Sequence, residues 1–228
     1  MTKEENYLKH KKETVIRIID HYNKNHTKKD KCNLVQDRNN FDLDQTFCSS
    51  EHCIHCGECC QSFPCVFSPN DFLDIKNIDY MLNILNTGLV CVGFNKAHFI
   101  IRPRGLKDKD AFGIQTGAYT TNGNRCLLLG KNGCLLNANY RPSEELLYYL
   151  DANQYDHHVL YDEDSYIEDY WEYRDIIYEL MGKYKTVFNQ SDVTKLLDER
   201  IKIIDSFYKD DETIITERAK QLIKAING

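Results

Sequence analysis

The sequence predicts an α+β fold, in which a cysteine-rich metal-binding region with short hairpins is followed by a mainly helical C-terminal tail. Three observations lead to this prediction. Four cysteines stand together in residues 53–60, apolar runs around turn residues follow in residues 89–136, and the pattern beyond residue 162 is helical to the end. We accordingly divide the chain into an N-terminal helix and loop (1–50), a cysteine-cluster metal-binding domain (51–162) and a helical C-terminal region (163–228).

Composition and charge narrow the class of protein. Hydrophobic residues make up 42% and charged residues 28% of the 228 residues, which is the balance of a globular domain. The formal net charge of −6, without a large basic cluster, argues against nucleic acid as a partner. No apolar run is long enough to cross a membrane, and the N-terminus lacks the pattern of a signal peptide. We therefore expect a cytoplasmic protein, in which disulfides are rare and ten cysteines need another explanation.

The N-terminal half is expected to hold two helices separated by a loop. Apolar residues recur at helical spacing in residues 14–22, whereas residues 26–50 are polar and lack periodicity. A second helix is predicted over residues 68–86. Its opening Ser-Pro-Asn-Asp supplies a capping serine, a proline at the first position and an acid in the first turn, and Gly88 ends it.

The middle of the chain is typical of two hairpins, and the end is typical of helices. Residues 89–104 form two β-rich runs around a polar Asn95-Lys96 turn, and Cys91 in the first run is expected in the core. Residues 126–136 form two shorter apolar runs around Gly-Lys-Asn-Gly. Beyond them, periodicity predicts helices at residues 164–188, 192–208 and 212–226. The first of these carries a tyrosine stripe that faces the core or, as the less favoured alternative, a partner: Tyr166, Tyr170 and Tyr173.

The motif Cys53-Ile-His-Cys56-Gly-Glu-Cys59-Cys60 leads to the functional prediction. A two-residue gap lets the chain turn so that two sulfurs reach one metal at about 2.3 Å. Gly57 eases that turn because glycine tolerates positive φ. Thiolates are soft ligands, which favour zinc or iron–sulfur centres over magnesium or calcium. Buried, reduced thiols packed as small hydrophobic groups are the plainer alternative, which fits four cysteines in eight residues poorly.

The spacing leaves the metal and its remote ligands open. Cys-x2-Cys-x2-Cys matches the first three ligands of a bacterial ferredoxin-type site, which takes its fourth thiolate from elsewhere. A zinc site would pair the motif with a second, distant pair of cysteines. Adjacent cysteines do not easily bind one ion, so Cys59 and Cys60 serve different centres or one is idle. An iron–sulfur cluster, preferably of the 4Fe–4S type, is the favoured cofactor and zinc the alternative. The candidate metal ligands are Cys53, Cys56, Cys59, Cys60, Cys65, Cys126 and Cys134.

These residues resemble the YkgJ-like cysteine-cluster family, described as zinc- or iron-chelating domains. The run from Cys53 to Cys60 is similar to the front signature of that family. Its rear elements are two cysteines, each followed by a short apolar run, and then an Arg-Pro pair. Similar residues stand here in the same order at Cys126, Cys134 and Arg141-Pro142. The resemblance covers about residues 50–145 and implies a metal site.

The chain departs from the family pattern after Cys134. The spacing to the Arg-Pro pair is one residue longer, and the cysteine expected after that pair is missing, because Ser-Glu-Glu-Leu follows. Cys65, or a carboxylate of Glu144 or Glu145, could take the place of the missing cysteine; otherwise one ligand is lost.

Two functions follow as hypotheses. In the first, an iron–sulfur cluster serves redox chemistry or the modification of a peptide or small molecule. In the second, a structural zinc module presents its helical tail to a protein partner. No Ser-His-Asp order, phosphate loop or pair of catalytic carboxylates is visible in the sequence, so no reaction and no catalytic residue are assigned. Arginines near the cysteines would offset thiolate charge, bind an anionic substrate or form ordinary salt bridges: Arg102, Arg104, Arg125 and Arg141.

Overall fold

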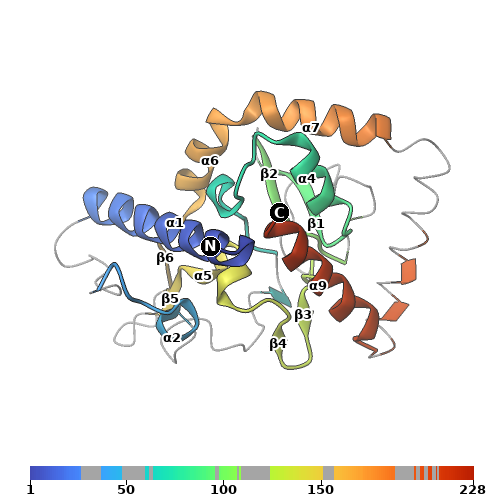
Figure 1. Cartoon of the computed structure of the whole chain (residues 1–228), viewed down its shortest axis with the longest axis horizontal. Coiled ribbons are helices and arrows are strands. Elements are labelled where there is room, and N and C mark those ends of the chain that lie inside the picture. Colours follow the sequence, from blue (N-terminus) through green and yellow to red (C-terminus); the bar gives the residue numbers. More distant parts are fainter. Residues whose placement is uncertain are drawn as a thin grey trace.

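The protein is a mixture of helices and small antiparallel sheets, as the sequence predicted (Figure 1). Among the described residues, three two-stranded sheets form, each from strands that are neighbours in the chain. The computed structural model describes residues 1–26, 37–47, 60–61, 64–95, 98–106, 108, 124–150, 157–187, 198, 201–202, 205–206, 209 and 211–228.

Helix α1 (Lys3–Asn25) is longer than the predicted helix over residues 14–22. It begins at a capping box, in which Thr2 and Glu5 each bond the backbone N–H of the other and satisfy donors that the helix leaves open. Its stripe of buried residues includes one lysine: Tyr7, Lys11, Thr14, Val15, Ile18, Ile19 and Tyr22. The short helix α2 (Leu43–Phe47) lies in the segment that was predicted as loop, so that part of the prediction is wrong.

The single helix predicted over residues 68–86 is wrong, although its start was placed correctly. Ser68 and Asp71 form a capping box around the 3₁₀ turn η1 (Pro69–Asp71), but the chain becomes extended at the next residue, Phe72. A new helix, α4 (Ile78–Leu85), begins after the Asn77 cap. The break brings the Phe72 side chain into the core, where it is 2% exposed. After α4, Gly88 adopts a φ of 77°, which glycine takes without steric cost.

Both predicted hairpins are present. Strand β1 (Val90–Asn95) pairs antiparallel with β2 (His98–Pro103), and β3 (Leu129–Gly130) pairs with β4 (Gly133–Cys134). Gly133 has a φ of 104°, so the tight β3–β4 turn depends on glycine. A third pair was not predicted: β5 (Tyr148–Leu150) with β6 (His157–Val159).

The described part of the C-terminal region is mainly helical, and it includes an interruption at Tyr173 that the sequence did not predict. Helix α6 (Glu163–Glu172) and helix α7 (Arg174–Val187) replace the predicted continuous helix and are separated at Tyr173. The last helix, α9 (Thr213–Ile226), agrees with the prediction, while the helix predicted over residues 192–208 lies mostly outside the described residues. The tyrosine stripe faces the core as expected, since Tyr166 and Tyr170 are buried.

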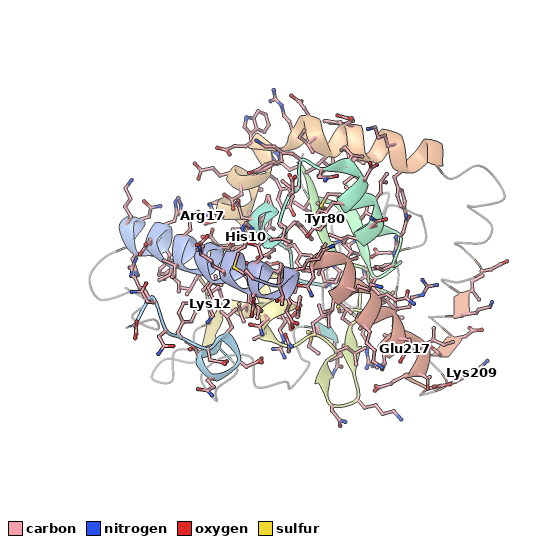
Figure 2. The ribbon with its side chains drawn as sticks, in the orientation of Figure 1. His10, Lys12, Arg17, Tyr80, Lys209 and Glu217 are labelled. Atoms are coloured by element: carbon pink, nitrogen blue, oxygen red, sulfur yellow. The ribbon has the colours of Figure 1, made fainter. Side chains whose placement is uncertain are left out.

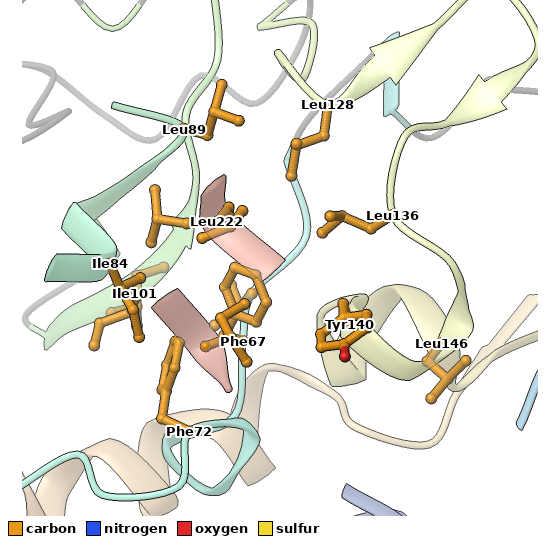
Figure 3. Packing of buried hydrophobic residues seen from close by; sticks show 14 of the residues in the cluster. Phe67, Phe72, Ile84, Leu89, Ile101, Leu128, Leu136, Tyr140, Leu146 and Leu222 are labelled. Atoms are coloured by element: carbon orange, nitrogen blue, oxygen red, sulfur yellow. The ribbon is translucent and has the colours of Figure 1, made fainter. Parts of the chain in front are cut away.

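One hydrophobic core joins residues from both ends of the chain to the middle. Figure 3 shows Leu222 of α9 beside Ile84 of α4 and Leu89, with Leu136 and Leu146 in the same region. The Tyr80 hydroxyl donates to the Ile226 carbonyl at 2.7 Å, where α4 meets α9 (Figure 2). The N- and C-termini lie side by side (Figure 1), and Lys3 Nζ contacts the Gly228 carbonyl. The last helix is therefore part of the core.

None of the helices in the described ranges is long and apolar enough to cross a membrane.

Candidate metal centre

The predicted ligands divide into those that the structure describes and those that it does not. Cys53, Cys56 and Cys59 lie outside the described residues. Cys60 and Cys65 are buried, at 7% and 4% exposure, and all described cysteines are in the thiol form. The core position predicted for Cys91 is confirmed by its burial.

The backbone around Cys126 links the end of the cysteine motif to the second hairpin. Its N–H donates to the Cys60 carbonyl at 2.7 Å. On its other side, Cys126 forms an antiparallel bridge with Gly105, which fixes the approach of the 104–106 segment. Two residues 66 positions apart in the sequence are therefore held in direct backbone contact, and the hydrogen bond fixes their relative position.

Cys134 reaches the same region through the β3–β4 hairpin, in which it pairs with Leu129. Its thiol interacts electrostatically with Cys126 and with Glu145 of the short helix α5 (Ser143–Leu146). Burial raises the pKa of the Cys126 thiol to about 12 and raises the pKa of Cys134, with the Glu145 carboxylate adding to both. The two thiols and this carboxyl group thus form one buried set of acids, called the Cys126–Cys134–Glu145 cluster below. The Glu145 carboxylate disfavours ionisation of both thiols, whereas the hydrogen bond with the Cys134 thiol lowers the pKa of Glu145.

The two neighbouring glutamates of α5 differ in what they contact. The Glu144 carboxylate accepts a hydrogen bond of 2.5 Å from the Val66 N–H. Burial raises its pKa to about 8 even though that hydrogen bond lowers it. The Glu145 carboxylate instead interacts with the Cys134 thiol, and its pKa is raised by burial despite the nearby charges of Arg141 and Lys11. Of the two carboxylates suggested by the sequence, Glu145 interacts with Cys126 and Cys134, whereas Glu144 bonds the residue that follows Cys65.

A buried ionic network fixes the start of α5. Lys11 and Asp71 are fully buried and paired at 2.5 Å, and Lys11 Nζ also donates to the Arg141 carbonyl at 2.8 Å. Asp71 accepts from the Ser143 N–H at 2.9 Å and from its hydroxyl at 2.6 Å. Burial lowers the pKa of Lys11 although the Asp71 carboxylate raises it. Helix α1 and turn η1 therefore hold Ser143 in place, two residues before Glu145.

Three of the four arginines that the sequence indicated as possible site residues bond to carboxylate or carbonyl groups of the protein itself. Arg102 forms a bidentate pair with Asp108 at 2.7 and 2.9 Å, and Arg104 donates to the Gly88 carbonyl at 3.0 Å. Arg141 Nε donates to the Leu136 carbonyl at 2.9 Å and lies 3.8 Å from Glu145 Oε1. Salt bridging, the plainer of the roles considered from the sequence, accounts for Arg102.

The donor types of the Cys126–Cys134–Glu145 cluster fit a zinc or iron centre. Both metals accept thiolate sulfur and carboxylate oxygen as ligands. Glu145 Oε1 is buried and has no hydrogen-bond partner among the described residues, so it has unused capacity as an acceptor. Within the described part of the chain, no three His, Cys, Asp or Glu side chains are arranged to hold a metal ion.

A separate cavity of about 200 Å³ lies between α1 and α6. Arg17 closes one side of it through a bidentate pair with Asp169 at 3.1 and 3.2 Å. Figure 2 shows Arg17 on the side of α1 that faces α6, opposite Lys12. The cavity includes none of the predicted ligands, and its other polar lining residues are His21, Tyr161, Ser165, Glu168 and Glu172.

Lys11 is a site residue that the sequence analysis missed. The signal was present, because Lys11 stands four residues after Tyr7 and four before Val15, on the apolar stripe of α1. A lysine on such a stripe indicates a buried partner for its charge, here Asp71.

No family model, curated protein or solved structure matches this chain.

Proposed function

We propose that this protein binds a metal centre through the cysteine motif at residues 53–60 together with Cys126 and Cys134, and that the favoured cofactor is an iron–sulfur cluster. The proposal depends chiefly on the 2.7 Å backbone hydrogen bond between Cys126 and Cys60, since it joins the motif to the hairpin that carries the remote thiols. The Cys-x2-Cys-x2-Cys spacing supports a cluster of the 4Fe–4S type. The resemblance to the YkgJ-like family agrees with such a site.

A bound cluster would supply one-electron transfer, or Lewis acidity at an iron that has a ligand other than cysteine. The protein would contribute the burial of the thiols and the fixed backbone around them. We infer redox chemistry, or modification of a peptide or small molecule, in the cytoplasm as the corresponding role.

The alternative is a structural zinc module that binds a protein partner, and an exposed surface on α6 and α7 favours it. Trp171 and Tyr178 are 56% and 58% exposed, and the Arg174 guanidinium stacks over the Trp171 ring at 4.6 Å. Trp, Tyr and Arg are the residue types that contribute most to binding energy in protein interfaces. The same surface would serve a peptide substrate in the first hypothesis.

Metal and sulfide analysis of protein purified without oxygen tests the proposal. We expect about four iron and four sulfide per chain for a 4Fe–4S cluster. One zinc per chain without sulfide would select the structural zinc module. Protein with no stoichiometric transition metal, after purification and after reconstitution, would overturn both.

Two serine variants and one control connect the metal to the cysteines. Cys126→Ser and Cys134→Ser should lose most of the metal, because serine is a poor ligand for soft metals. Cys91→Ser is the matched control: Cys91 is also buried, but its Sγ lies 3.9 Å from Asp108 Oδ2 in a separate contact. Equal metal content in all three variants would contradict the assignment of Cys126 and Cys134.

A further inference from the structure

The cavity between α1 and α6 has the size and the lining of a binding site for one amphipathic group. Its volume of about 200 Å³ is below the about 300–1,000 Å³ of pockets for drug-sized ligands, so it has room for a single side chain or a small molecule. The buried Ile18 and Tyr161 line it together with charged residues of both helices. A guest with an apolar stem and a charged end, such as a lysine or arginine side chain, matches this mixture.

The charges around the cavity determine the sign of the guest. Arg17 and Asp169 offset each other in a bidentate pair. Glu168 and Glu172 remain, both exposed on α6, and among the described residues neither carboxylate has a hydrogen-bond or ion-pair partner. Two carboxylates four positions apart on a helix repel each other, so a cation placed between them is favoured. The cavity therefore suits a positively charged group.

The remaining acid of the cavity is held in place by the protein itself. The Tyr161 hydroxyl donates to Asp169 Oδ2 at 2.8 Å, and the Ser68 hydroxyl donates to the same oxygen at 3.3 Å. With the two bonds from Arg17, the carboxylate is fixed between α1, α6 and the start of η1. A site whose walls are fixed before binding loses less conformational entropy when the ligand arrives.

We propose that this cavity binds a lysine or arginine side chain of a peptide or protein partner. The exposed surface of α6 and α7 favours a partner chain over a free amine. Trp171 directly precedes Glu172, the Arg174 guanidinium stacks over its ring, and Tyr178 is exposed on α7. These residue types contribute strongly to protein interfaces, and a small amine would leave them uncovered. The inference does not depend on the metal centre.

Trp171 is the only tryptophan of the chain and lies on α6, so its fluorescence reports binding there. The test is a titration of the full chain with a short peptide of alternating lysine and glycine. A peptide with glutamine in place of each lysine is the first control, and n-butylamine is the second. We expect a saturable change with the lysine peptide, none with the glutamine peptide, and much weaker binding of n-butylamine.

Two pairs of substitutions locate the binding. Glu168→Gln together with Glu172→Gln should weaken binding of the lysine peptide at least about threefold, because two ion pairs are lost. Asp164→Asn together with Glu179→Gln is the matched control, since it removes the same charge from exposed positions of α6 and α7 that do not line the cavity. Its affinity should stay close to that of the wild type.

Arg17→Met should change the affinity in the opposite direction. It releases the Asp169 carboxylate from its counter-charge, so the lysine peptide should bind more tightly than to the wild type. Circular dichroism of each variant shows whether it is folded, and metal content should be the same in all of them.

Three results would overturn the inference. The first is the absence of a saturable change with the lysine peptide, or an equal change with the glutamine peptide. The second is an equal loss of affinity in the two double variants, which would indicate a general attraction to an acidic surface. The third is n-butylamine binding as tightly as the lysine peptide, which would remove the partner chain. None of these results bears on metal binding, which is measured separately.

Discussion

The buried Lys11–Asp71 ion pair allows a prediction about stability. If one partner is removed, Asp71 keeps more hydrogen bonds than Lys11 does. Asp71 accepts four hydrogen bonds, from Lys11 Nζ, the Ser68 N–H at 2.8 Å, and the N–H and hydroxyl of Ser143. Without its lysine, the carboxylate keeps three donors. Without its carboxylate, the buried ammonium keeps the Arg141 carbonyl at 2.8 Å and a long contact of 3.4 Å to the Ser143 hydroxyl.

The magnitudes follow from this asymmetry. Removing one partner of a buried ion pair costs about 3–5 kcal/mol when the other charge is left uncompensated. We expect Asp71→Asn to cost about 4 kcal/mol, and Lys11→Met about 2 kcal/mol, because three donors still satisfy the carboxylate. For a chain of this size, about 4 kcal/mol lowers the melting temperature by about 8–16 °C.

The double variant is the decisive comparison. In the Asp71→Asn variant, stability is lost because the buried Lys11 ammonium has no compensating charge. Adding Lys11→Met removes that ammonium, so the double variant should be at least as stable as Asp71→Asn alone. Urea unfolding of metal-free protein, followed by circular dichroism, measures all four proteins of the cycle. Additive losses, or a larger loss for Lys11→Met than for Asp71→Asn, would refute the reasoning.

Two further predictions concern pH and glycine. Burial raises the pKa of Asp108, but the hydrogen bonds and charge of Arg102 lower it, and the net shift is downward. The Arg102–Asp108 pair therefore stabilises the fold fully above about pH 4, and this stabilisation is lost as the pH falls through the lowered pKa of Asp108. Asp108→Asn should therefore unfold more easily at neutral pH and show a shallower loss of stability in acid, and parallel pH curves for both proteins would contradict this. Gly105→Ala should cost about 1–3 kcal/mol, because its Cβ would lie 2.1 Å from the Asn124 Oδ1 atom, whereas a Cβ on Gly182 of α7 meets nothing within 4 Å. Gly182→Ala should stabilise the protein by about 0.5–1 kcal/mol, and denaturant unfolding that gives both substitutions the same sign would contradict the packing argument.

The sequence predicted correctly those helices and hairpins that depend on periodicity and turn residues within a few positions. The β1–β2 hairpin, the glycine-dependent turn before Cys134 and the last helix were all predicted, because periodicity and turn residues act over a few positions. The Ser68 capping box was also correct. No long helix follows this capping box, because Phe72 packs into the core and Asp71 is bonded to Lys11 and Ser143. Those contacts are 60 and 72 residues distant in the chain, beyond the range of any local pattern.

For the candidate site, the sequence by itself predicted a set of possible ligands: the cysteine motif, Cys65, Cys126 and Cys134, with two glutamates offered as equals where the family pattern lacks a cysteine. Only the tertiary structure distinguished those glutamates. Neighbouring residues on a short helix point in different directions, so Glu144 meets the Val66 N–H and Glu145 meets the Cys134 thiol. The sequence gives the chemical type of each side chain directly. Which side chains lie close together depends on how the whole chain packs, and contacts between segments distant in the sequence determine that packing.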